Sequence, residues 1–364
     1  MTADIADIAE LARERNILIC CGSGGVGKTT ISAALGVEAA RLGRRACVVT
    51  IDPAKRLANA LGIDALSNIP HEIEGPWSGQ LCALMLDAKG TFDDLVDRYS
   101  SSSEQADAIT SNRIYRNLTG GLSGTQEYMA MEKLYELVEE SRFDLVIVDT
   151  PPTRHALDFL EAPSRLTRFL GHRLFQALLL PTRAYLRAVS FATQALLRTI
   201  SKVAGAEIVD DAISFFQAFD GMQDGFRARA ERVRELLESE TTGFILVSSA
   251  RPDTVAEAGW FADKLHESGL RVEGLVVNRM YPTFGTATDV RSVDPTTALG
   301  KLQANLRSYQ SLTAREEQAF RELAARLAPA PVARVPLLEV DVHDVAGLTE
   351  VADHLSAAPT QRAG

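Results

Sequence analysis

Seven short runs of apolar and β-branched residues recur along the chain, and each is followed by a stretch with helical periodicity. The runs lie at Ile17–Cys21, Ala46–Ile51, Leu81–Leu86, Leu145–Asp149, Phe244–Ser248, Gly274–Asn278 and Val332–Leu337. Apolar runs without alternation are typical of parallel strands that are covered on both faces, and the helical stretches supply the crossovers that such strands need. The sequence therefore predicts an α/β fold with a doubly wound, mostly parallel sheet.

Two gaps between these runs are much longer than a crossover helix requires. They extend from Asp87 to Phe143 and from Pro163 to Gly243, and both have helical periodicity with short breaks. We therefore expect a single domain over 1–364 that carries an inserted helical subdomain, contributed by about 88–142 and 161–241.

Two smaller features complete the expected organisation. The segment Thr286–Leu327 is predicted to be an insert that is helical from Thr313 onward. The tail 354–364 is expected to be frayed, because terminal residues are poorly ordered unless something holds them.

Composition limits the class of protein. The chain has 48 acidic and 38 basic residues and a net charge of −10, so no nucleic-acid partner is expected. Its four cysteines lie in the predicted strands without a C-x-x-C pair, which favours small buried thiols. No signal peptide is apparent, and the longest apolar stretch is interrupted by Arg and Lys. We expect a cytoplasmic protein, with peripheral contact to a membrane as the alternative.

A glycine-rich loop follows the first predicted strand and opens a helical pattern. Gly22, Gly27, Lys28 and Thr29 have the spacing G-x-x-x-x-G-K-[ST] of a phosphate-binding loop. Glycines let several backbone N–H groups point at a phosphate, and the following helix adds the positive end of its dipole. The predicted nucleotide-binding residues of the loop are Gly22, Ser23, Gly24, Gly25, Val26, Gly27, Lys28, Thr29 and Thr30.

Two aspartates stand at or just beyond the ends of predicted strands. Asp52 lies in VTIDPAKRLANAL, and Asp149 lies in LVIVDTPPTRHALDFL. Either aspartate alone is often only a turn residue or a helix cap. Because the carboxyl ends of parallel strands share one edge of the sheet, the two together with the glycine loop favour a site for Mg²⁺ and phosphate.

These three segments together resemble the ArsA family of anion-transporting ATPases, which belongs to the deviant class of phosphate-loop (Walker A) proteins. The family pattern D-P-A-x-x-L stands here as Asp52–Leu57, and D-T-x-P-T-x-H-x-L-x-x-L stands as Asp149–Leu160. The likeness continues at Leu275–Arg279 and Val335–Leu337, so it covers most of the chain. The resemblance implies a Mg²⁺-dependent ATPase that works as a dimer.

The resemblance also implies catalytic roles. Asp52 would position the attacking water, and Lys28 would stabilise the phosphates during transfer. Thr29 and Asp149 would hold Mg²⁺, with Asp149 acting through a water. ATP and Mg²⁺ are the expected cofactors.

Further residues are implied to read the base and to transmit the nucleotide state. Asn278 would read the edge of the adenine, and Pro336 would pack against the ring. Asp149, Thr153 and His155 would couple the phosphate state to the helical subdomain. His155 as a metal ligand is the alternative, but no second ligand stands four residues further on.

The loop departs from the family pattern at its second residue. The family usually has a lysine there that reaches the nucleotide of the partner subunit, but this chain has Ser23. Either a lysine-containing paralogue supplies the charge in a heterodimer, or a homodimer uses a different cation such as Arg56 or Arg154. We expect slow hydrolysis by the isolated chain. A weakly hydrolytic regulatory subunit is an alternative.

Other family features are missing. Members that target tail-anchored proteins bind zinc through a C-x-x-C pair, and the stretch after Asn278 has no cysteine, so no zinc is expected. The arsenite-pump members collect their cargo on three cysteines, and none of the four cysteines lies in the helical part. Coupling to anion transport is therefore a less favoured alternative. A membrane-surface organiser like MinD or ParA is also less favoured, because it predicts a terminal amphipathic anchor that AAPTQRAG does not provide.

The stretch Ser164–Lys202 carries many Leu, Phe and Ala residues with Arg and Lys among them and no acidic residue. A basic amphipathic helix pair of this kind binds either a hydrophobic client helix or a membrane partner. The alternative is a helical hairpin that covers its own core. The favoured role is handling of a hydrophobic client.

Overall fold

The computed structural model forms two compact units. The sheet unit comprises Met1–Met85, Glu140–Arg154 and Glu240–Gly364, and the helical unit comprises Leu86–Glu139 and His155–Ser239. The residues that the structure describes are 7–51, 55–113, 115–116, 125–151, 211, 214–215, 217–219, 221–283, 294 and 296–356.

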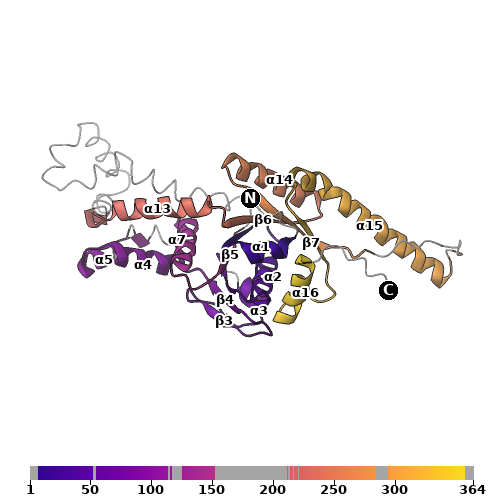
Figure 1. The fold of residues 1–364 in the computed structure, drawn as a ribbon, viewed down its shortest axis with the longest axis horizontal. Coiled ribbons are helices and arrows are strands. Elements are labelled where there is room, and N and C mark those ends of the chain that lie inside the picture. Colours follow the sequence, from indigo (N-terminus) through magenta and orange to yellow (C-terminus); the bar gives the residue numbers. More distant parts are fainter. Residues whose placement is uncertain are drawn as a thin grey trace. The chain divides into compact units, whose positions relative to one another are not determined.

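An eight-stranded sheet forms the centre of the sheet unit (Figure 1), with the order β3-β4-β2-β5-β1-β6-β7-β8. All neighbouring strands are parallel except β3 and β4, which are antiparallel. The strands are β1 (Ile17–Cys21), β2 (Arg45–Thr50), β3 (His71–Ile73), β4 (Gln80–Met85), β5 (Leu145–Asp149), β6 (Thr242–Ser249), β7 (Val272–Met280) and β8 (Val332–Pro336).

The predicted α/β class and its mostly parallel sheet are confirmed. All seven predicted strands are present, with ends that move by at most two residues. The strand that the sequence did not predict is β3, which has three residues, of which His71 and Glu72 are exposed. Its sequence lacks the apolar run that identified the other strands, because an edge strand of this length buries only one side chain.

Helices cover the sheet. They are α1 (Ile8–Glu14), α2 (Lys28–Arg41), α3 (Arg56–Leu61), α14 (Pro252–Glu267), α15 (Ala298–Leu327) and α16 (Val345–Leu355). The helix α2 packs on β2 and against α1, α3 and α16. A Cβ atom at Gly36 of α2 would lie 2.7 Å from a Val48 methyl group, so this glycine permits close approach of helix and sheet. His354 and Leu355, which the sequence assigned to the tail, still belong to α16.

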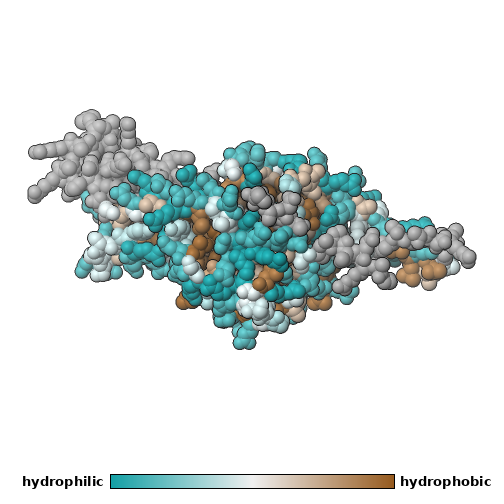
Figure 2. Space-filling view, in the orientation of Figure 1, coloured by the Kyte–Doolittle hydropathy of each residue, from teal (hydrophilic) through white to brown (hydrophobic). Residues whose placement is uncertain are grey.

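The helix α15 corrects one prediction. It begins at Ala298 rather than at Thr313, because Thr297 caps it: the Thr297 hydroxyl accepts a hydrogen bond from the Gly300 N–H at 3.1 Å. Leu299 and Leu302 in the added turns are 57% and 65% exposed. Figure 2 shows hydrophobic residues at this outer end of the helix.

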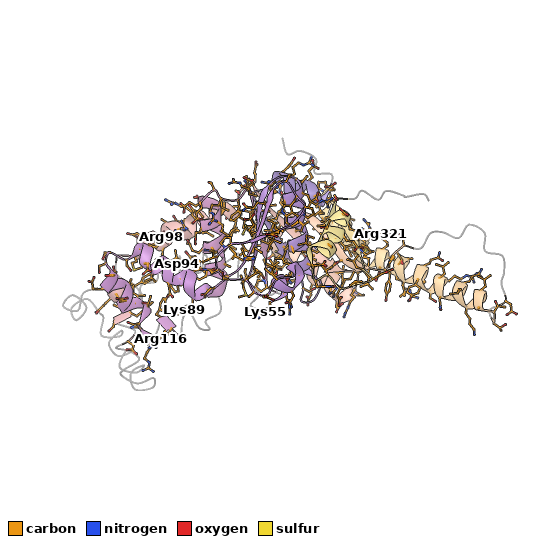
Figure 3. The ribbon with its side chains drawn as sticks, turned by 90° about the horizontal axis from the view of Figure 1, so that it is seen from below. Lys55, Lys89, Asp94, Arg98, Arg116 and Arg321 are labelled. Atoms are coloured by element: carbon orange, nitrogen blue, oxygen red, sulfur yellow. The ribbon has the colours of Figure 1, made fainter. Side chains whose placement is uncertain are left out.

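The helical unit has an aromatic core. The described helices of this unit are α4 (Ala88–Tyr99), α5 (Ser103–Thr110), α7 (Thr125–Glu139) and α13 (Gln223–Leu237). The Phe226 ring centroid lies 5.3 Å from that of Tyr99 and 5.0 Å from that of Phe219. Lys89, Asp94 and Arg98 are exposed residues of α4 (Figure 3). The whole of the basic stretch at 164–202 lies outside the described residues.

Two further expectations concern cysteines and membranes. Cys20, Cys21, Cys47 and Cys82 are all buried, as predicted. Burial raises the pKa of the Cys20 thiol to about 12, which makes it a poor nucleophile. Among the residues that the structure describes, no helix combines the length and the apolar character needed to cross a membrane.

Arg44 joins three parts of the sheet unit just before β2. Its guanidinium donates to the Ala12 carbonyl at 2.7 Å and to the Arg15 carbonyl at 2.6 Å, at the end of α1. It also donates to the carbonyl of Asp144, which precedes β5. The neighbouring Arg45 instead forms an exposed ion pair with the Asp144 carboxylate at 2.7 Å.

We expect the Arg44→Ala substitution to lower the free energy of unfolding by about 2–3 kcal/mol, because three carbonyls lose a charged donor. Arg45→Ala is the matched control and should produce a much smaller change, since exposed ion pairs contribute little. Urea denaturation of both variants measures the difference. Equal effects of the two substitutions would contradict the role assigned to Arg44.

Candidate functional site

The glycine-rich loop connects β1 to α2 at the carboxyl edge of the sheet. A Cβ atom at Gly22 would lie 2.0 Å from the Val247 carbonyl oxygen of β6, so no larger residue fits there without movement of the backbone. Gly25 and Gly27 have φ angles of 78° and 94°, in the left-handed region that glycine adopts at low cost. A Cβ atom at Gly27 would also lie 2.2 Å from Asn278 Nδ2, so the glycines are explained by two close approaches and two left-handed residues.

Lys28 is the first residue of α2 and is buried beneath the loop. Its ammonium group donates to the carbonyl oxygens of Gly22 and Ser23, each at 3.0 Å. Burial lowers the pKa of Lys28 below its ordinary value, although the nearby Asp149 acts in the opposite direction. The loop thus holds a buried positive charge. A bound anion would offset the free-energy cost of removing this charge from water.

Asp149 accepts hydrogen bonds from two threonines. The Thr29 hydroxyl donates to Asp149 Oδ2 at 2.7 Å, and the Thr50 hydroxyl donates to the same oxygen at 2.9 Å. Asp149 is 1% exposed. The start of α2 and the ends of β2 and β5 therefore meet at one carboxylate. A hydroxyl and a carboxylate are the oxygen ligands that Mg²⁺ prefers, so this donor set fits the ion.

Thr50 was not among the predicted site residues. It is the last residue of β2 and lies in register with Asp149 of the neighbouring β5. The sequence contained the signal, a hydroxyl two positions before the predicted Asp52, but the pairing of β2 with β5 was needed to interpret it.

A cavity of about 610 Å³ extends from the loop to the segment after β8. This volume is in the range of small-molecule sites. One end is polar, with Lys28, Thr29 and Asp149, and the other contains the apolar side chains of Pro336 and Val342. The predicted residues that line the cavity are Gly25, Gly27, Lys28, Thr29, Thr30, Asp149, Asn278 and Pro336.

Asn278 lies in the cavity wall but its amide is engaged within the protein. Its Nδ2 donates to the Val26 carbonyl at 2.8 Å, and its Oδ1 accepts from the Arg279 N–H at 2.9 Å. The expected contact with an adenine edge stays a prediction; these two hydrogen bonds leave one N–H donor and one acceptor lone pair of the amide for it.

The remaining predicted site residues either do not line the cavity or lie outside the described residues. Ser23 is 4% exposed and contributes its carbonyl to Lys28. Asp52, Thr153 and His155 lie outside the described residues. Lys55 directly precedes α3 (Figure 3), and the first residue of that helix, Arg56, lines the cavity.

The sequence reasoning missed several residues that line the cavity. Arg279 lines the cavity, and its Nη1 donates to the Gly25 carbonyl at 3.2 Å. Leu338 and Val340 also line it, and Val340 is 67% exposed. Within the described ranges, no group of three or more His, Cys, Asp or Glu side chains is arranged to hold a metal ion.

The sequence as a whole matches known proteins. The family model described as an anion-transporting ATPase matches residues 15–357. Relatives include the ATPase GET3 of Ajellomyces dermatitidis, 30% identical over 154 residues, and the ATPase get3 of Aspergillus terreus, 29% identical over 153 residues. Each alignment covers 41% of this chain, and 43% and 44% of the respective relative. The chain therefore spans less than half the length of the curated relatives it matches.

The loop geometry predicts unequal effects of two alanine substitutions. Gly22→Ala should lower the free energy of unfolding by roughly 3 kcal/mol, because the new methyl group overlaps a backbone carbonyl. Gly25→Ala should cost only about 1–2 kcal/mol, from the left-handed φ alone, because a Cβ there meets nothing within 4 Å. Chemical denaturation of both variants tests this order, and a reversed order would contradict the close packing of Gly22 on β6.

Proposed function

The chain belongs to the family of anion-transporting ATPases, and we propose that it binds ATP with Mg²⁺ in the loop cavity and hydrolyses the terminal phosphate. One observation carries this proposal. The buried Lys28 ammonium group and the Thr29–Asp149 hydrogen bond stand together at the polar end of a cavity large enough for a nucleotide.

The polyphosphate would occupy the loop. The backbone N–H groups of Gly22 to Thr29 and the N-terminus of α2 favour an anion at this position. Lys28 would exchange its two carbonyl partners for phosphate oxygens, which carry full negative charge and form stronger hydrogen bonds. The ammonium group that donates to the loop carbonyls is thus the one that would contact the phosphates.

Thr29 and Asp149 would hold the magnesium ion, Asp149 through a water. When bound, the ion would neutralise the negative charge that develops on the phosphate oxygens. The Thr29 hydroxyl now donates to Asp149, so this hydrogen bond is the one that binding would replace. Thr50 would keep its own hydrogen bond and hold the carboxylate in position.

Asp52 would orient the attacking water. A carboxylate performs this task without a raised pKa, by accepting a hydrogen bond from the water. Support comes from its place in the chain: it follows β2 by two residues, and the last residue of β2 already contacts Asp149. At the other end of the cavity, Pro336 and Asn278 would contact the adenine.

The finer role of the protein also belongs to this proposal. We infer a cytoplasmic dimer. Because Ser23 brings no cation to the loop, the partner is either a second copy that uses another cation or a lysine-containing paralogue. Thr153 and His155 would transmit the nucleotide state from Asp149 to the helical unit. The basic, apolar stretch Ser164–Lys202 would handle a hydrophobic client helix or a membrane protein.

We expect the Lys28→Ala substitution to weaken ATP binding by at least about 100-fold, because the cavity loses its buried charge. The protein should remain folded, since burial of this ammonium group is itself unfavourable. Isothermal titration with ATP and Mg²⁺ measures the effect, and Lys301→Ala, at an exposed position on α15, is the control. Unchanged affinity in Lys28→Ala would count against the site.

The Asp52→Asn substitution should leave ATP affinity within about threefold of the natural protein but reduce turnover by about 10²–10⁴, because the amide orients water less well. Single-turnover phosphate release and a separate binding titration distinguish the two effects. Hydrolysis at the original rate would show that another group positions the water.

A further inference from the structure

Arg279 has a backbone conformation that arginine rarely adopts. Its φ angle is 59°, in the left-handed region. The position coincides with a bulge in β7: Val277 pairs with Arg334 and Met280 pairs with Pro336, so three steps along β7 match two along β8. Bulges beside functional sites re-aim a side chain, and glycine usually occupies their left-handed residue. Arginine at this position indicates that the side chain itself is needed.

The bulge is attached to the glycine-rich loop. Asn278, which is 6% exposed, accepts the Arg279 N–H through Oδ1 and donates to the Val26 carbonyl through Nδ2. These two hydrogen bonds stabilise the unusual backbone and fix its distance from the loop. The Arg279 side chain is therefore presented from a rigid support.

The guanidinium of Arg279 lies at the loop, and no carboxylate of the described residues pairs with it. Its Nη1 donates to the Gly25 carbonyl at 3.2 Å, and the residue lines the same cavity as Lys28 and Thr29. Within the described residues it forms no ion pair, in contrast to Arg45 and Arg334. A guanidinium has five N–H donors in a planar fork, which matches phosphate oxygens. The Gly25 contact uses one of them.

We propose that Arg279 binds the polyphosphate of the bound nucleotide from within the same chain. This inference rests on the proposed nucleotide site. Nη1 keeps the Gly25 carbonyl, and the remaining donors of the fork take phosphate oxygens. The strained bulge persists because it places this cation over the loop, where Ser23 supplies none.

Two substitutions separate the side chain from the backbone. Arg279→Gly removes both the guanidinium and the φ strain, and Arg279→Asn removes the guanidinium with a residue that tolerates the left-handed region. Ser141→Gly is the matched control, because Ser141 also has a positive φ, of 53°, and does not line the cavity.

The measurement is the affinity of each variant for adenosine, ADP and ATP, together with its thermal unfolding midpoint without ligand. We expect both Arg279 variants to bind ADP and ATP about 10–100-fold more weakly and to bind adenosine within about threefold of the natural protein. Their ADP affinity should also depend less steeply on salt. The midpoint of Arg279→Gly should not fall, and Ser141→Gly should keep all three affinities.

Unchanged ADP and ATP affinities in both variants would overturn the proposal. An equal loss for adenosine would also overturn it, because it would place the contact at the base or ribose, or in the packing of Asn278. Failure of the whole site is recognised separately: the natural protein would then not bind ATP, or Lys28→Ala would bind it unchanged.

Discussion

The carboxylate of Asp149 is the point on which the site depends. It is almost fully buried, and a buried charge is stable only when polar groups surround it. Thr29 and Thr50 provide hydroxyls from elements that are distant in sequence. They reach the same oxygen because β5 lies between β1 and β2 and all three strands run in one direction. The position of β5 between β1 and β2 therefore brings these groups together.

The second feature on which the site depends is the buried positive charge of Lys28. Its ammonium group donates to two loop carbonyls, and burial lowers its pKa. A phosphate held in the loop would offset part of the cost of burying this charge, which favours an anion at this position.

Sequence reasoning succeeded where the pattern is local. The seven buried strands and the glycine-rich loop follow from apolar runs and from fixed spacing. It failed where tertiary pairing decides: β3 has no apolar run, α15 begins at a capped Thr297, and Thr50 acquires meaning only through its register with Asp149. The role of Arg279 was missed for the same reason, because the bulge that places it depends on the pairing of β7 with β8.

Ser23 and Arg279 concern the same physical need. A loop that binds a polyphosphate needs positive charge near its mouth, and the second loop position supplies none in this chain. The bulge of β7, whose backbone Asn278 stabilises, brings the Arg279 guanidinium to the loop, where it donates to the Gly25 carbonyl. A cation held in this way belongs to the subunit that binds the nucleotide, and it is present in the absence of a partner. Nucleotide affinity would then depend on a cation of this chain itself, so the proposed binding would not require a second subunit.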